Sequence, residues 1–263
     1  MSWADVMDEN NDFEEYDDPP PYQEPSAIDP SALRQALCKL ILLGDDPYLR
    51  MQAFNLAIVD PFLMELEYKL LKKLVDEERT PLPEAAFLSA QSQMWIFAAY
   101  ELMRTWRQRA HDMIKWAESG GLEQKLATLE KEAGYQHFGR QYRASQIRAV
   151  LADPDRVNAI QRDLKRTHML FARLEAIRIC LAKHEVRRKK NSVALRPGYG
   201  WINSWCGALD YEIEDGRYSL GNINRRDIAD EIRMLLADDY VPSDEDIASF
   251  DQFMRGPAEP PPE

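Results

Sequence analysis

The stretch from Met94 to Met103, MWIFAAYELM, restricts the fold of this chain more than any other part of the sequence. It lies in a predicted long helix that begins after TPLPE and ends at the SGG of residues 119–121. A helix that is apolar around most of its circumference must be covered by neighbouring elements. Glu101 is the one charge in the stretch, and a buried carboxylate needs a cationic partner. We therefore expect a bundle built around a central helix.

Asp–Pro pairs indicate where the surrounding helices begin. Aspartate is a good N-cap residue, and proline fits the first turn of a helix. Apolar residues at helical spacing follow each pair, which occurs at Asp29-Pro30, Asp46-Pro47, Asp60-Pro61 and Asp153-Pro154. We predict helices that begin near residues 30, 47, 61 and 154, and the last should continue to about residue 188. The predicted fold is mainly α, a bundle of five to eight helices.

The pattern changes at residue 191, where the helical periodicity ends. In ALDYEIEDGRYSLG, Asp215-Gly216 is typical of a two-residue hairpin turn. Such a turn pairs Glu214 with Arg217, Ile213 with Tyr218 and Tyr211 with Leu220. This register gives the hairpin one apolar face, which must pack on something because an isolated hairpin is marginally stable. Asn224 and Asp227 then cap a C-terminal helix, and we expect the hairpin and the helix to pack on the bundle.

The charge is distributed unevenly along the chain. Residues 1–30 hold ten acidic side chains and no basic one, and residues 238–263 hold eight acidic side chains and Arg255. The net charge of −12 therefore resides in the two ends, and the body is mildly basic. We predict a disordered acidic tail over 1–29, a helical bundle over 30–190, a loop, hairpin and helix over 191–238, and an acidic tail with a short helix over 239–263.

Several classes of protein are not expected from this sequence. It contains no long uncharged apolar stretch and no secretory signal, so we expect a cytoplasmic protein that does not enter a membrane. The three cysteines, Cys38, Cys180 and Cys206, lie far apart and should be reduced thiols. The histidines and cysteines have no metal-ligand spacing, and no glycine-rich nucleotide motif occurs. We expect neither a metal nor a cofactor.

Arg178 and His184 form the sharpest candidate for chemistry. Histidine can act as a general acid or base near neutral pH, and arginine can stabilise a phosphate. On a regular helix the two side chains point about 120° apart, so they converge only if the helix loosens or a second protomer contributes its own pair. The structural alternative is a packed histidine at a helix end and an arginine that pairs with Glu175. Glu101 is the partner that we favour for Arg178.

An arginine followed by a histidine after five residues, late in a helical bundle, resembles the R-x4-6-H motif of the HEPN superfamily. Arg178 and His184 match the motif, whereas Ile179 stands where many members carry a polar residue. The resemblance covers only the helical part, about residues 84–188. It implies a metal-independent ribonuclease, or an inactive relative that binds RNA or a protein partner, usually as a homodimer.

A basic and aromatic segment follows this pair. Its candidate nucleic-acid-binding residues are Lys183, Arg187, Arg188, Lys189, Lys190, Tyr199 and Trp201, with Trp205 as a further stacking surface. The main prediction is a cytoplasmic interaction or regulatory protein that binds a protein partner or nucleic acid. The first alternative is a HEPN-like ribonuclease that uses Arg178 and His184. The second is a small-molecule enzyme with a site near residues 196–206. The sequence leaves the oligomeric state open, with a homodimer favoured by the ribonuclease alternative.

Overall fold

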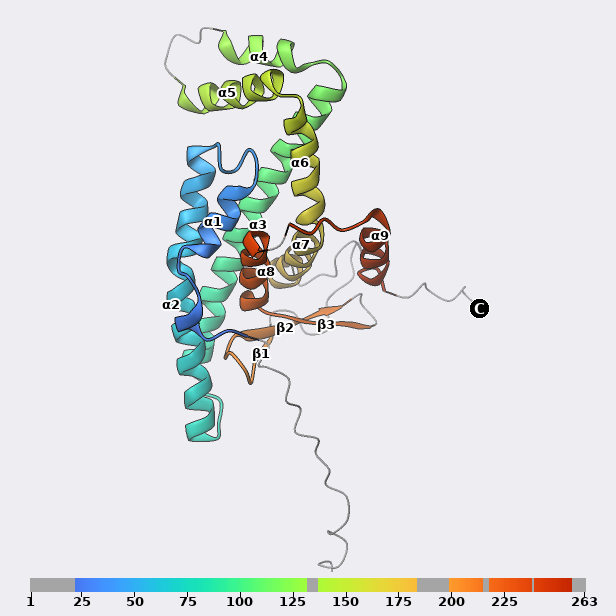
Figure 1. The fold of residues 1–263 in the computed structure, drawn as a ribbon. Helices are drawn as coiled ribbons and strands as arrows, with labels where there is room; N and C mark the ends of the chain where they lie inside the picture. The colour runs from blue at the N-terminus through green and yellow to red at the C-terminus, as the bar shows by residue number, and fades with distance from the viewer. Residues whose placement is uncertain (1–21, 132–136, 184–198, 215–217, 238, 257–263) are drawn as a thin grey trace, which may run out of the picture.

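The computed structural model describes residues 22–131, 137–183, 199–214, 218–237 and 239–256. In these residues the fold is mainly α with one small antiparallel sheet, as predicted (Figure 1). The elements are η1 (Pro25–Ala27), α1 (Ala32–Lys39), α2 (Pro47–Glu77), α3 (Leu82–Glu118), α4 (Leu122–Glu130), α5 (Phe138–Ala152), α6 (Asp155–Arg166), α7 (His168–Lys183), β1 (Gly200–Ile202), β2 (Leu209–Glu214), β3 (Ser219–Ile223), α8 (Arg225–Ala237) and α9 (Asp244–Phe253). The predicted tail over 1–29 and the end of the chain fall largely outside the described residues.

Helix α3 is the central helix of the fold. It contacts α2, α4, α6, α7, α8 and β2. Its buried side chains include Ile96, Ala99, Leu102, Met103 and Trp106, which belong to one continuous hydrophobic core. The prediction of a covered apolar helix is confirmed for this face. The edge that carries Met94 and Glu101 is exposed to solvent, so the helix is not covered on every side.

The Asp–Pro signal was right at three positions and wrong at one. Helices begin at Ala32, Pro47 and Asp155, but α2 continues through Pro61 without a new start. Asp60 does not cap a helix because its buried carboxylate binds arginines of α8 instead. Tertiary contacts on both sides of α2 therefore outweigh the cost of a proline inside a helix.

The predicted helix from 154 to 188 is two helices in the described part of the chain. Thr167 separates α6 from α7, and its hydroxyl donates to the carbonyl oxygen of Asp163 at 2.8 Å. Arg107 of α3 donates to the Thr167 hydroxyl at 3.3 Å. These side-chain contacts stabilise the break, which hydrophobic periodicity alone does not indicate. Residues 184–188 lie outside the described residues.

The sheet has the strand order β1-β2-β3, and both pairs are antiparallel. The observed partners are Tyr211 with Ile223, Glu212 with Asn222, Ile213 with Gly221, and Glu214 with Ser219, with an irregularity between Ile213 and Glu214. The predicted register is therefore wrong. It placed Tyr218 on the packed face, but Tyr218 is exposed, and Ile223 is fully buried instead. Burial of Ile223 on the core outweighs the preference for a two-residue turn, and Asp215 and Gly216 lie outside the described residues.

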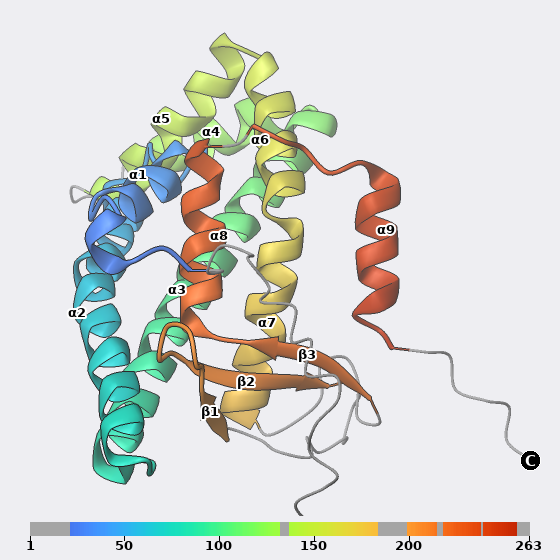
Figure 2. The ribbon, with the colours of Figure 1, turned by 60° about the horizontal axis from the view of Figure 1, so that its bottom comes forward.

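The third strand, β1, was not predicted. It is only three residues long, too short for an alternating pattern to be recognised. Gly200 faces Tyr211, and a Cβ atom on Gly200 would lie 3.0 Å from the tyrosine ring. The sheet lies across one end of α7 and α8, and α9 stands beside α7 (Figure 2). α9 begins with a capping box formed by Ser243 and Asp246.

Candidate functional site

Arg178 is part of a stack of planar groups between α3 and α7. Its guanidinium lies 5.0 Å from the centre of the Tyr100 ring. Tyr100 stacks on Phe171 with 5.7 Å between ring centroids, and the guanidinium of Arg107 covers the other ring at 4.6 Å. Cation–π contacts of this kind stabilise helix packing. The described contacts of Arg178 are thus those of a packing residue.

Glu101 does not form the buried pair with Arg178 that the sequence suggested. It is exposed and binds Arg104, one turn further along α3, at 2.7 Å. The physical reason is that Glu101 lies on the open edge of α3, where solvent and a neighbour on the same helix satisfy the carboxylate. Exposed pairs of this kind contribute little to stability.

Most of the predicted basic residues lie outside the described residues. These are His184, Arg187, Arg188, Lys189 and Lys190, and for Lys183 only the backbone, at the end of α7, is described. The structure therefore leaves the relation between Arg178 and His184 untested. It does describe the aromatic residues of this region. Tyr199 and Trp201 are in edge contact at 5.4 Å, and Trp205 is exposed on the loop before β2.

The inner face of α2 carries an ion cluster that the sequence analysis missed. Arg225, which is 0% exposed, donates to both carboxylate oxygens of Glu67 at 2.7 Å and also to Asp60. Arg233 binds the second oxygen of Asp60. Burial alone lowers the pKa of Arg225, but the two carboxylates outweigh it and raise the pKa above its usual range. Seven-residue spacing of Asp60 and Glu67 on one helix was the signal available in the sequence.

The same end of α8 holds the N-terminal segment of the described chain. Tyr22 donates to Asp227 at 2.8 Å and accepts from Asn224 at 3.0 Å. Arg226 donates to the carbonyl oxygen of Gln23 at 2.6 Å. The chain is therefore fixed to α8 at residues 22 and 23, and from there it continues through η1 to α1.

The outer face of α2 is apolar where it meets solvent. We call Met51, Phe54, Ile58 and Phe62 the α2 ridge. Their spacing along the helix places them on one stripe, and each side chain is between 46% and 65% exposed. Val59 and Met94 extend this exposed apolar surface toward α3. Soluble monomers rarely leave a continuous apolar patch of this kind uncovered.

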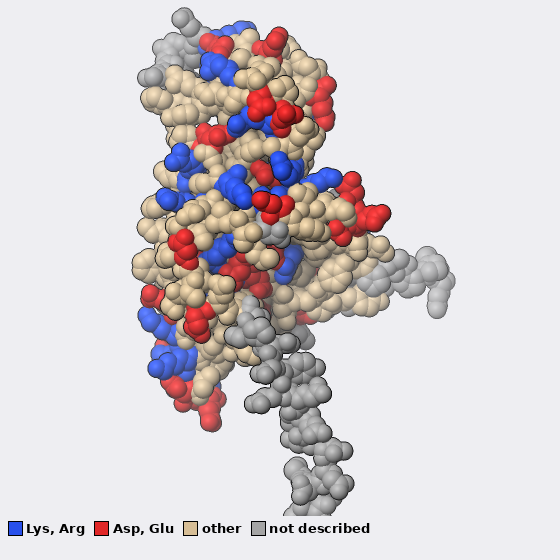
Figure 3. Space-filling model, in the orientation of Figure 1, with Lys and Arg blue, Asp and Glu red and all other residues tan. Residues whose placement is uncertain are grey.

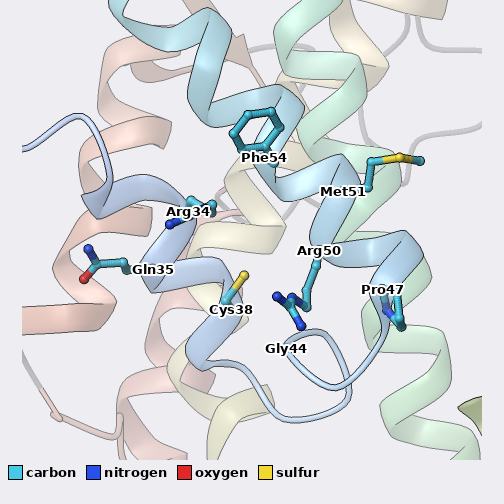
Figure 4. A pocket seen from close by; sticks show the side chains of 8 residues that line it. All are labelled: Arg34, Gln35, Cys38, Gly44, Pro47, Arg50, Met51 and Phe54. Carbon is cyan, nitrogen blue, oxygen red and sulfur yellow. The ribbon is translucent and has the colours of Figure 1, made fainter.

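A groove runs between α1 and α2 along one side of the ridge. One cavity of about 570 Å³ is lined by Arg34, Cys38, Arg50 and Phe54, among others (Figure 4). A second cavity of about 420 Å³ shares Arg34 and Phe54 and continues to Phe62. We call the two together the α1–α2 groove. A third cavity of about 420 Å³ lies on the other side of the ridge, between α2 and α3.

The groove carries positive charge that is not paired with any acidic side chain of the described residues. Among the described residues, neither the Arg34 nor the Arg50 guanidinium makes an ion pair or a hydrogen bond. Arg50 and the Cys38 thiol face each other between the helices, and Arg34 lines the groove from α1 (Figure 4). Burial raises the pKa of Cys38, and the two arginines partly oppose this. The groove can therefore hold an apolar group and a carboxylate at the same time.

The loop that joins α1 to α2 is tied to three other helices. A Cβ atom on Gly44 would lie 2.1 Å from the Cys38 carbonyl oxygen, so the turn requires glycine. From α3, Trp106 donates to the Ile41 carbonyl oxygen at 2.7 Å, and Arg109 donates to the Asp46 carboxylate at 2.5 Å. From α5, Gln146 donates to the Leu42 carbonyl oxygen at 2.9 Å, and from α6 the Asp163 carboxylate accepts from the Ile41 amide at 2.9 Å. These contacts fix one end of the groove.

Other types of site find no support in the part of the chain that the structure describes. No group of three or more histidine, cysteine or acidic side chains there could hold a metal ion. None of the helices described combines the length and hydrophobicity needed to cross a bilayer. Basic and acidic side chains alternate over the face shown in Figure 3, which carries no continuous basic stripe.

Comparison with known proteins adds no assignment to this geometry. No protein-family model matches the chain, and neither a curated protein nor a solved structure matches it.

Proposed function

We propose that this chain is a binding protein whose docking surface is the α2 ridge together with the α1–α2 groove. The ligand is an amphipathic segment of a partner protein, with carboxylates next to its apolar side chains. The observation that carries the proposal is the ridge itself, four large apolar side chains exposed on one stripe of α2. Grooves beside such a stripe accept helices through apolar anchors spaced three, four and seven residues apart.

The two arginines determine the charge of the ligand. Arg34 and Arg50 lie where the groove meets the ridge, and their guanidinium groups are available to bind carboxylates in two-point contacts. A ligand with lysines at the same positions would place like charges next to each other. The groove therefore favours acidic apolar segments over basic ones.

A displayed library of random 16-residue peptides tests the proposal directly. Selected peptides should combine apolar residues at helical spacing with aspartate or glutamate. Their affinity should fall at least tenfold for Ile58→Glu and for Arg50→Glu. Lys72→Glu is the matched control, because Lys72 is exposed on α2 away from the ridge and should leave binding unchanged. Peptides without acidic residues, binding that survives Ile58→Glu, or no selected peptide at all would overturn the proposal.

RNA binding is the second candidate function, with the HEPN-like ribonuclease as its catalytic form. The exposed aromatic side chains of Tyr199, Trp201 and Trp205 favour it, because such rings can stack on unpaired bases. In this case single-stranded RNA should bind less tightly to Tyr199→Ala and Trp205→Ala. Cleavage, if it occurs, should be lost with His184→Ala. RNA affinity that is unaffected by both aromatic substitutions would exclude the candidate.

A further inference from the structure

We infer that residues 1–21 of this chain bind the α1–α2 groove of their own molecule and compete there with the partner segment. The inference rests on the proposed docking function and names a regulator of that surface. It depends on three observations, which are the chemistry of the groove, the composition of residues 1–21, and the point at which the described chain is fixed.

Residues 1–21 have the composition that the groove favours. They contain eight acidic side chains and no basic one. Their large apolar side chains occur in two groups at helical spacing, Trp3 with Val6 and Met7, and Phe13 with Tyr16. The acidic groups can bind Arg34 and Arg50, while the apolar groups cover Phe54 and the rest of the ridge. No other undescribed segment combines these properties. Residues 257–263 have two acidic side chains and no large apolar one, and residues 184–198 are strongly basic.

The chain is fixed close enough for this contact. Tyr22 and Gln23 are bound to α8, and Pro30 and Ser31 already line the groove at its Phe62 end. Twenty-one extended residues span up to about 70 Å. The whole of α2 is about 45 Å long. In an extended conformation residues 1–21 are therefore longer than the whole of α2, so the attachment at Tyr22 does not prevent their contact with the ridge.

Because residues 1–21 are covalently joined to the fold, even a weak contact is sufficient to keep them in the groove. A segment joined to its site by a short linker experiences an effective concentration in the millimolar range. An intrinsic affinity that would be negligible between separate molecules then keeps the groove largely occupied. A partner segment must displace residues 1–21, which lowers its apparent affinity by the occupied fraction.

Cys38 provides a direct readout of occupancy. It is a partly exposed thiol in the groove, whereas Cys180 and Cys206 are buried and residues 1–21 contain no cysteine. The rate of Cys38 modification by a maleimide should rise at least fivefold when residues 1–21 are deleted. Neutralising Glu14, Glu15, Asp17 and Asp18 to the corresponding amides should give most of this increase. Deletion of residues 257–263 is the control and should not change the rate. Equal rates in the full chain and the deletion variant would overturn the inference.

Oxidative cross-linking identifies which copy of the segment is bound. A cysteine introduced by Met7→Cys should form a disulfide with Cys38 within one chain, and Pro260→Cys should not. If disulfides form only between two chains, the segment binds the groove of a second copy, and the inference as stated is overturned.

Both measurements use the protein alone. If library peptides bind while Cys38 reactivity is unaffected by the deletion, the docking function stands and the inference fails. If Cys38 is protected but no peptide is selected, the segment binds and the partner function fails.

Discussion

The two faces of α2 each depart from what a surface helix normally shows, because charges are buried among the apolar residues of its inner face and large apolar side chains are exposed on its outer face. Its inner face carries Asp60 and Glu67, both buried, and its outer face carries Phe54, Ile58 and Phe62, all exposed. An ordinary amphipathic helix places apolar residues inside and charges outside. The difference separates two roles, since the inner carboxylates hold α2 to α8 and the outer apolar side chains have no partner in the described structure.

The buried charges of the inner face are tolerated because they are matched. Burial raises the pKa of Glu67, and the nearby Arg225 guanidinium opposes this by stabilising the carboxylate. Such a cluster compensates the cost of desolvation when every member is present, and loses this balance when one is removed. The comparison can therefore be tested separately on each face.

The largest effect is expected from Arg225→Met. Removing this fully buried guanidinium leaves Asp60 and Glu67 without their shared partner, which should cost about 3–5 kcal/mol of unfolding free energy. Urea unfolding followed by circular dichroism measures it. Arg104→Met, which removes an exposed pair with Glu101, should lower the unfolding free energy far less. Equal losses in the two variants would show that the inner cluster contributes no more than a surface pair.

The next effect concerns the close approach of the loop between β1 and β2 to the inner side of α2. Gly207 has φ +75°, and a Cβ atom there would lie 1.9 Å from the Glu67 carbonyl oxygen. Gly120 has a similar φ of +69° with nothing within 4 Å of such an atom. Gly120→Ala should therefore cost only the backbone strain of about 1–3 kcal/mol. Gly207→Ala should cost clearly more, because the loop must also move away from α2. Urea unfolding of both variants measures the two losses of unfolding free energy. Similar losses would contradict a tight contact between Gly207 and α2.

On the outer face, substitution should hardly change stability. Phe62 is 65% exposed and its neighbour Leu63 is 2% exposed, so the two give a matched pair on successive residues. Phe62→Gln should alter the unfolding free energy by less than about 0.5 kcal/mol. Leu63→Ala should lower it by about 2–5 kcal/mol. Only Phe62→Gln should weaken peptide binding without loss of fold. A large loss of stability in Phe62→Gln would mean that the ridge is part of the core.

The smallest effect is a pH dependence at the start of α8. Burial raises the pKa of Asp227 above its ordinary value of 3.8, against the hydrogen bonds from Asn224 and Tyr22. The folded state then binds the proton more tightly than the unfolded state, so this group's contribution to stability is present below pH 3.8 and lost as the pH rises through the raised value. The difference in unfolding free energy between wild type and Asp227→Asn should fall over this interval.

Asp29 is the control of opposite sign. Hydrogen bonds from the backbone and side chain of Ser31 lower the pKa of Asp29. The contribution of Asp29 to the unfolding free energy should therefore increase as the pH rises through its lowered pKa. If wild type and Asp227→Asn keep a constant difference across the titration, the Asp227 carboxyl does not have the raised pKa inferred from its burial.

Sequence patterns predicted the elements whose signals are local. The apolar stretch of α3, the helix starts at 47 and 155 and the apolar face of β2 follow from periodicity and capping. The continuation of α2 through Pro61 and the register of the hairpin depend on distant partners, Arg225 and the core around Ile223. No local rule contains this information.

The candidate site also depends on information that is not local in the sequence. Apolar residues occur on both faces of α2, so periodicity cannot distinguish the exposed ridge from buried positions such as Leu63 and Leu70. The groove residues come from two helices, and nothing in the sequence joins Arg34 to Arg50. The pair Arg178 and His184 was the clearer motif, yet the described contacts place Arg178 against Tyr100.

The short connection over residues 40–46 has a consequence for how the surface recognises a ligand. Its backbone is bound by side chains of Trp106, Gln146 and Asp163, which come from helices far along the chain. Amide protons in this connection, above all that of Ile41, should exchange with deuterium as slowly as those of the core helices. The binding surface is then rigid before the ligand arrives. Almost all of the conformational entropy lost in complex formation is therefore lost by the incoming segment.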